Sequence, residues 1–230
     1  MPRPSSWYKN KAGKRLCGAT TPIGIIWEPY KAKNMLDWAV TKAMNFEDGE
    51  LKPIYHEWDR NRKGLTGTIT HGKCIDYVTG ETTDLTKERN DYFYCKEVED
   101  RSDLLLGKFK TWYDAHPFSL VQWENQMVHE EFQYGGTPDM TTAITSTIKD
   151  IKTGFVDEFS CGLQLSAYSE LNYHNFGYRC RGQIVGFDQK DNIKVVEYSQ
   201  KELESMFPIF LKALDIYKFK QQYLKEKKHG

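Results

Sequence analysis

Charged side chains, among them two acids and a lysine, interrupt a stretch that otherwise has the composition of two β-strands, and this segment limits the folds open to the chain. Residues 135–152 read GGTPDMTTAITSTIKDIK and place Asp139, Asp150 and Lys152 among Thr, Ser, Ala and Ile. Acidic and cationic side chains are poor strand formers, and an unpaired charge is costly to bury. The three groups therefore either face solvent, as an ordinary surface ion pair, or act together.

A hairpin with a two-residue turn at positions 145–146 predicts that the three groups share one face. In that register Asp139 lies opposite Lys152, and Thr141 lies opposite Asp150. Directly paired Cβ atoms lie roughly 5 Å apart and diagonal ones roughly 7–8 Å apart, so the two carboxylates can share one cation. A one-residue change in the loop moves Asp139 to the other face. Thr-Ser is not a typical turn dipeptide, so the loop length stays open.

The remaining pattern predicts a mixed α/β chain. Helices are expected within residues 22–44 after a short entry, and over 65–78, 100–115, 162–173 and from 201 toward the C-terminus. Strands are expected over 119–132, in the hairpin of 135–152, and over 178–188 and 192–199. No linker divides these elements, so we expect one structural domain. Its parts are a basic arm (1–20), a helical N-terminal part (21–115) and a core that ends in the C-terminal helix (116–230).

Composition excludes several classes of protein. A chain of 230 residues with 39% hydrophobic and 28% charged residues is typical of a soluble globular protein. No apolar run reaches the ~18 residues of a membrane span, and we expect no secretory signal because the N-terminus lacks an apolar core. The five cysteines form no CxxC pair, which favours a reducing compartment and argues against zinc or iron–sulfur ligation. We expect a cytoplasmic location, with a mitochondrial one as the alternative.

Positive charge gathers at the two ends of a chain whose formal net charge is zero. Residues 1–27 carry five cations and no acid, and residues 218–228 carry five lysines against Glu226 alone. Basic ends on a neutral body can hold phosphate groups. The alternative is that both ends are simply solvated.

The residue types of the hairpin suit phosphodiester chemistry. Carboxylate oxygens are ligands for hard cations such as Mg²⁺, which also keeps water and phosphate oxygens as ligands. A neighbouring lysine can orient or deprotonate the attacking water and offset charge on a phosphoryl group. The acid-x-lysine string alone is weak evidence, because it also occurs elsewhere, for example at Asp188–Lys190. Its place in a predicted strand, beside another acid, distinguishes the string at Asp150.

In this setting the segment resembles the PD-(D/E)XK nuclease superfamily, with Pro138-Asp139 as the "PD" and residues 150–152 as the "(D/E)XK". GLTGTITHG (64–72) is similar to the upstream G-T-x-x-H helix of the RecB-type and phage exonucleases and places His71 at the motif histidine. QLSAY (164–168) is similar to the Q-x-x-x-Y helix of the same branch. The motifs occur in the family's order over roughly residues 60–220.

The run ENQMVHEEFQYGGTPD (124–139) is similar to the segment in which a strand glutamate precedes the G-T-x-D turn, which singles out Glu124. The resemblance implies that Glu124 is an accessory acid. Glu130 and Glu131 compete for that role if the strand register differs. From Glu124 to the C-terminal helix the layout is similar to that of the mitochondrial genome-maintenance exonucleases.

The resemblance also implies the remaining roles. Asp139, Asp150 and the main-chain carbonyl of Ile151 would hold Mg²⁺, or Mn²⁺ as its substitute, with His71 as a further ligand. Lys152 would position the nucleophilic water. The alternative for His71 is an ordinary helix histidine.

Gln164 and Tyr168 lie four residues apart on one predicted helix face, so both can point into the site. The resemblance implies that they hold the substrate or support Lys152. The alternatives are a surface amide for Gln164 and a residue at the edge of the core for Tyr168.

The implied fold is a restriction-endonuclease-like core, a mixed central β-sheet flanked by helices, with a helical N-terminal extension. The implied activity is that of a metal-dependent DNA exonuclease in recombination, repair or replication, encoded by a phage and acting in the host cytoplasm. Its partner would be DNA that is single-stranded or has free ends, with no membrane. A homo-oligomer and a single-strand-annealing or -binding protein partner stay open. The alternative functions are an endonuclease of the same fold, a non-catalytic nucleic-acid-binding module and a structural subunit of a replication or packaging complex.

Overall fold

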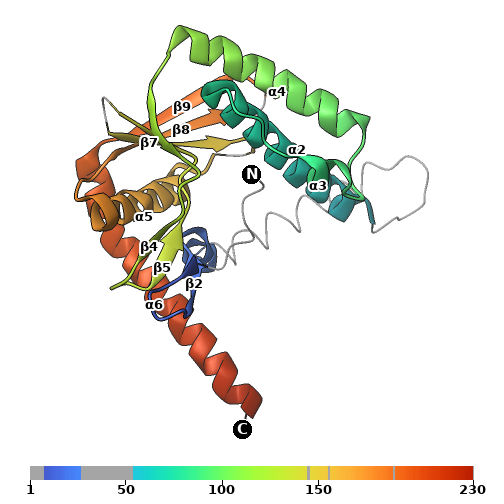
Figure 1. Ribbon diagram of the computed structural model, residues 1–230. Coiled ribbons are helices and arrows are strands. Elements are labelled where there is room, and N and C mark those ends of the chain that lie inside the picture. Colours follow the sequence, from blue (N-terminus) through green and yellow to red (C-terminus); the bar gives the residue numbers. More distant parts are fainter. Residues whose placement is uncertain (1–7, 27–53, 144–145, 155, 189, 230) are drawn as a thin grey trace. The chain divides into compact units, whose positions relative to one another are not determined.

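The computed structural model describes residues 8–26, 54–143, 146–154, 156–188 and 190–229 of the chain (Figure 1). The described residues divide into two compact units. Unit 1 contains residues 54–110, and unit 2 contains residues 8–26 together with 111–229. The N-terminal residues 8–26 thus belong to the same unit as the C-terminal half, and the division at residues 20 and 115 into parts of one domain stays a prediction.

Unit 1 is helical. Its elements are α2 (Ile54–Thr79), α3 (Thr86–Arg89) and α4 (Lys96–Ala115), the last five residues of which belong to unit 2. Ile69, Leu85 and Val98 form a buried cluster that joins the three segments. The Lys73 ammonium lies 3.0 Å from the Glu99 carboxylate and links α2 to α4. Unit 1 therefore has a small apolar core of its own, bordered by ion pairs.

Unit 2 contains a five-stranded mixed sheet. Across the sheet the order is β3 (Leu120–Trp123), β6 (Met140–Thr142), β7 (Thr147–Lys152), β8 (Arg181–Phe187) and β9 (Ile193–Tyr198). β7 and β8 are parallel, and the other neighbouring pairs are antiparallel. Parallel neighbours need a crossover connection, which α5 (Glu158–Phe176) provides here. Residues 147–151 are all buried, as expected for a strand covered on both faces.

A second sheet of unit 2 incorporates the N-terminal residues. Its order is β1 (Tyr8–Lys9), β2 (Arg15–Gly18), β5 (Tyr134–Gly136) and β4 (Met127–His129). The Tyr8 ring packs directly on the backbone of Gly135, and the Tyr8 hydroxyl lies 2.9 Å from Oγ1 of Thr137. The buried Tyr134 hydroxyl donates to the carbonyl of Ala167 at 2.9 Å and so fixes this sheet to α5.

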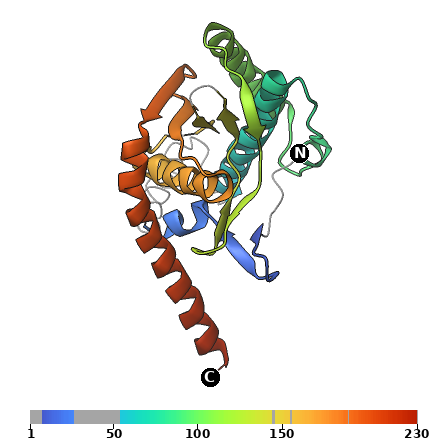
Figure 2. The same cartoon turned by 60° about the vertical axis from the view of Figure 1, so that its left-hand side comes forward.

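The two long helices of unit 2 have identifiable ends and packing faces. The carboxylate of Asp157 caps the start of α5 by accepting a hydrogen bond from the Ser160 amide, and Gly177, at φ +83°, ends the helix in the left-handed conformation that glycine adopts without strain. α6 (Gln200–His229) packs beside α5, and its buried Phe210 meets the Tyr134 ring edge-on. The C-terminal part of α6 continues past both sheets (Figures 1 and 2). None of the helices in the described part of the chain is long and apolar enough to cross a membrane.

The predicted fold class is confirmed: the chain is mixed α/β, with mixed sheets flanked by helices, an arrangement consistent with a restriction-endonuclease-like fold. The predicted helices at 65–78, 100–115, 162–173 and from 201 lie within α2, α4, α5 and α6, and the strands at 178–188 and 192–199 are β8 and β9. Residues 20–26, at the start of the segment predicted to enter a helix, are helical, and residues 27–44 lie outside the described residues.

Two predictions about strands were wrong. Residues 119–132 form two strands rather than one, β3 and β4, which belong to different sheets. The break comes at Glu124, whose φ of +44° ends the pleated strand. Residues 8–18 of the predicted basic arm contain β1 and β2, because Tyr8 and its neighbours pack on the sheet while the cations point outward.

The contact between Tyr8 and Gly135 predicts a strong dependence on the glycine. A Cβ atom at Gly135 would lie 2.1 Å from the Tyr8 ring, so the strand or the ring must shift. We expect Gly135→Ala to lower the free energy of unfolding by about 1–3 kcal/mol, measured by urea denaturation. Gly154→Ala is the matched control, because a Cβ atom there meets nothing within 4 Å. Equal stability of the two variants would contradict this packing.

Candidate active site

The β6–β7 hairpin brings the two predicted acids to the same level of the sheet. Met140 pairs with Lys149 and Thr141 with Ile148, so the predicted pairs Asp139–Lys152 and Thr141–Asp150 were wrong by two residues. Because a shift of two residues preserves the face of the sheet, the prediction that the acids share a face survives the error. Asp139, directly before β6, reaches β7 and accepts a hydrogen bond from the Ile151 amide at 2.8 Å.

A side chain of α5 completes a hydrogen-bonded network around the second acid. Gln164 donates through Nε2 to Asp150 Oδ1 at 3.0 Å and to the Tyr168 hydroxyl at 3.0 Å. Its Oε1 accepts from Lys152 Nζ at 3.0 Å. Since a carboxylate only accepts and an ammonium only donates, these contacts fix the orientation of the amide. The structure therefore brings Asp150, Lys152, Gln164 and Tyr168 together.

The charges of this network are buried. Asp150 is 0% and Asp139 1% exposed, while the Lys152 side chain, about a quarter exposed, places Nζ 2.5 Å from Asp150 Oδ2. Burial acts to lower the pKa of Lys152, but the charges of Asp150 and Asp139 outweigh it and raise that pKa above its ordinary value. Two carboxylates face one ammonium, so the network carries an excess negative charge that a cation can offset.

Three glutamates, Glu124, Glu130 and Glu131, are candidates for the predicted accessory acid. The Glu124 amide donates to the Asp139 carbonyl at 3.0 Å, so its backbone lies beside the first acid. Glu130 is held elsewhere, where its carboxylate accepts from the Lys11 amide at 2.9 Å. Glu131 is exposed in the same turn after β4. Of the three, Glu124 is the one whose backbone adjoins the site.

His71 lies on α2 and is buried in unit 1. The two acids belong to unit 2. His71 therefore stays a predicted ligand, on the strength of the motif alone.

Sequence reasoning passed over Cys161, which adjoins the network. It is buried on α5, three residues before Gln164 and seven before Tyr168, a spacing that places all three on one helix face. Burial raises the pKa of the Cys161 thiol to about 11, although the Lys152 ammonium acts in the opposite direction. The thiol is therefore protonated near neutral pH and forms part of the site wall. The helical spacing was the signal that could have identified it.

Comparisons with known proteins give structural likeness only. No family model matches the chain, and no curated protein matches it. Among solved structures, a protein from Eubacterium rectale that is named as an unconfirmed exonuclease is 14% identical, with a TM-score of 0.43 over 65% of this chain and 68% of that one. The alkaline exonuclease of Laribacter hongkongensis is 15% identical, with a TM-score of 0.34 over 75% of this chain and 97% of that one. The structure of the same enzyme in complex with dAMP is 14% identical, with a TM-score of 0.38, and again covers 75% of this chain and 97% of that one.

The charges of the network predict the effect of removing the Lys152 ammonium group. Lys152→Met leaves two buried carboxylates uncompensated, so we expect the free energy of unfolding to fall by about 3 kcal/mol. Lys194→Met is the control, because Lys194 pairs with Glu158 at the exposed surface and its loss should cost less than about 1 kcal/mol.

The pH dependence provides a second measurement of the same interaction. A lysine whose pKa is raised in the folded state stabilises the fold below its unfolded pKa, and this contribution disappears as pH rises through the folded pKa. The stability difference between the wild type and Lys152→Met should therefore be constant from pH 7 to 9 and shrink above about pH 10.5. Urea denaturation across this range tests it, and a difference that grows with pH would contradict the pairing.

Proposed function

We propose that the protein is a metal-dependent DNA exonuclease that hydrolyses phosphodiester bonds from strand ends. The observation that carries the proposal is the buried network in which Asp150, Lys152 and Gln164 converge on one face of the sheet with Asp139. Two acids and a lysine on one face of the sheet are groups that metal-assisted hydrolysis of a phosphodiester can use.

The donor set fits magnesium better than zinc. Within the described residues, no three or more His, Cys, Asp and Glu side chains form a metal-binding group. Mg²⁺ is commonly bound by one or two carboxylates, with water and phosphate oxygens as the other ligands. We propose that Asp139, Asp150 and the carbonyl of Ile151 hold Mg²⁺, or Mn²⁺ in its place, and that His71 adds a ligand. The excess negative charge of the network supports this assignment.

Each residue then has a defined part in the reaction. A bound Mg²⁺ would supply positive charge that stabilises the phosphoryl oxygens as they gain negative charge. Lys152 would orient the attacking water and offset charge on the phosphate, and Gln164 would hold the ammonium at its position. The water oxygen would bond to phosphorus and release a proton to solvent as the P–O3′ bond breaks, and the departing 3′ oxygen would take up a proton from solvent. The products are a 5′-phosphate and a 3′-hydroxyl.

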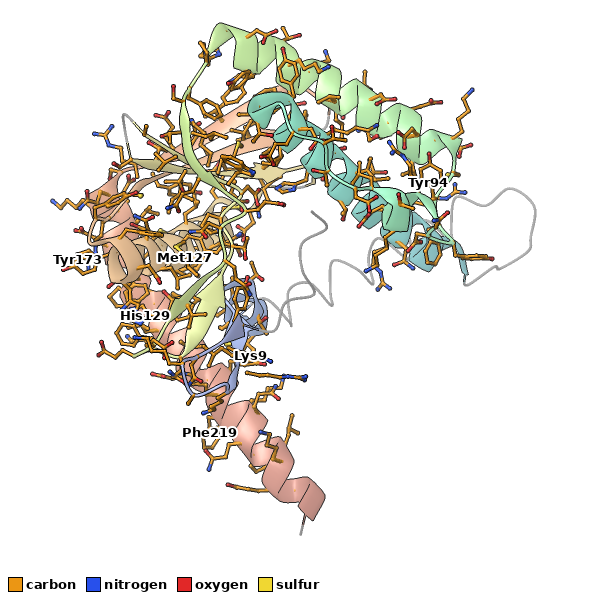
Figure 3. The ribbon with its side chains drawn as sticks, in the orientation of Figure 1. Lys9, Tyr94, Met127, His129, Tyr173 and Phe219 are labelled. Atoms are coloured by element: carbon orange, nitrogen blue, oxygen red, sulfur yellow. The ribbon has the colours of Figure 1, made fainter. Side chains whose placement is uncertain are left out.

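Two basic segments of unit 2 support DNA as the substrate. The β1–β2 hairpin carries Lys9, Lys11, Lys14 and Arg15, and the end of α6 carries the lysines at 218–228. Both contact the turn after β4, because Lys11 meets Glu130 there, and Lys218 donates to the carbonyl of Phe132 at 2.7 Å. The β1–β2 hairpin and the start of the C-terminal basic run are therefore neighbours in the fold, and Figure 3 labels Lys9 and Phe219 on these two segments. We propose that this surface holds the phosphates of a DNA strand with a free end, as recombination or repair would present it.

Degradation assays test the proposal. Labelled linear DNA should be degraded with Mg²⁺ and left intact with a chelator, and Asp150→Asn should lower the rate by roughly 10²–10³-fold or more. Asp188→Asn is the matched control, because Asp188 begins another acid-x-lysine string in the exposed turn after β8. A covalently closed circle should survive. Cutting of the circle would show an endonuclease, and binding without degradation would show a non-catalytic module.

Salt dependence tests the basic surface. Lys225→Gln with Lys227→Gln, both at the exposed end of α6, should weaken binding to single-stranded DNA. The slope of log K against log salt should fall in magnitude by about 0.7 for each phosphate that the double variant no longer neutralises. Lys201→Gln, in the first turn of the same helix, should leave the slope unchanged. Fluorescence anisotropy with a chelator measures both, and equal slopes in all three proteins would remove the DNA-binding role of this helix end.

A further inference from the structure

An open hollow of about 410 Å³ lies at the end of β3. It is lined by Gln122, Trp123, Asn125 and Phe176, and so by the end of one strand and the last residue of α5. None of the four lining residues is charged, so the hollow is not suited to a phosphate group.

The walls of the hollow suit a flat heteroaromatic ring. Trp123 is 38% and Phe176 42% exposed, so part of each aromatic side chain is accessible to a ligand. Exposed aromatic faces bind nucleobases by stacking, largely without regard to sequence. No aliphatic side chain contributes to the lining, which distinguishes the hollow from a groove that takes an apolar helix.

The two amides add hydrogen-bonding groups beside the rings. Asn125 Nδ2 donates to Gln122 Oε1 at 2.9 Å, which orients both side chains. This contact leaves Asn125 Oδ1 as an acceptor and Gln122 Nε2 as a donor. A neighbouring donor and acceptor match the polar edge of a base.

The register of the sheet places one lining residue of the hollow on the face that carries the acids of the candidate site. Trp123 pairs with Met140, the residue that follows Asp139, and Gln122 pairs with Thr141. Because alternate residues share a face, Gln122 lies on the same face of the sheet as Asp139, at a diagonal Cβ distance of roughly 7–8 Å, and Trp123 lies on the other face of this edge strand. A strand that passes the acids can therefore place a base in the hollow at the edge of the sheet.

We propose that this hollow binds a nucleobase of the substrate strand at the edge of the sheet. The proposal rests on the proposed nuclease function and adds a subsite that makes the enzyme recognise bases by their aromatic faces rather than by sequence. Trp123 and Phe176 supply the stacking surfaces, and the amide pair supplies a weaker contact to the base edge.

Binding measured with a chelator tests the subsite without any cleavage. The probes are a fluorescent thymidine hexamer and a hexamer of the same length and charge that lacks every base. The wild type should bind the thymidine hexamer more tightly by about tenfold or more. Trp123→Ala and, separately, Phe176→Ala should weaken binding of the thymidine hexamer by about tenfold and leave binding of the base-free hexamer unchanged.

Two controls separate stacking from general damage. Trp123→Phe should restore most of the affinity, because it keeps an aromatic face, and Tyr92→Ala removes an aromatic ring that is 78% exposed in unit 1 and should have no effect. The proposal is overturned if Trp123→Ala binds the thymidine hexamer as the wild type does, or if it weakens both hexamers equally. Failure of the proposed function is recognised separately, as absence of Mg²⁺-dependent degradation by a wild type that still prefers the hexamer with bases.

Discussion

The ion pair between Lys152 and Asp150 is the interaction on which the site depends. A carboxylate that is fully buried would be strongly destabilising without a partner, and the ammonium at 2.5 Å supplies one. Gln164 contacts both charges, and its amide cannot be reversed without breaking both hydrogen bonds. A helix and a strand are thereby joined at the place where phosphodiester chemistry is proposed, so the same contacts that stabilise the fold also set the geometry of the reacting groups.

The surroundings of this pair follow from the topology of unit 2. β7 and β8 are parallel, so a crossover is required, and α5 carries Gln164 and Tyr168 across the sheet to the acids. The N-terminal strands add a second sheet that is fixed to α5 through Tyr134. In this arrangement the charged network has a packed scaffold on its helix side, while Lys152 keeps partial access to solvent. Such a site can hold its groups rigidly and still admit a substrate.

Several features were predictable because they depend on local pattern. The helical periodicity of α2, α4, α5 and α6 and the apolar runs of β8 and β9 identified these elements correctly. The four-residue spacing of Gln164 and Tyr168 placed them on one helix face, and the structure shows them in contact. The error in the hairpin register came from the position of the loop, since moving the centre of the turn by one residue slides the pairing by two residues without changing the face of either acid. The division of residues 119–132 was missed because one residue with positive φ breaks a run whose composition is continuous.

The amino-acid sequence by itself determined the mixed α/β class and the main helices, because these depend on periodicity and residue type, and it limited the two acids to one face or opposite faces of a hairpin. The register that the tertiary structure sets decided that they share a face. Only the tertiary structure decided that Asp139 bonds to the Ile151 amide and that the two basic ends meet at one turn. It also decided that Trp123 and Phe176, 53 positions apart in the sequence, border one hollow. These contacts join segments far apart in the chain, and long-range register is set by packing and loop geometry that no local pattern encodes.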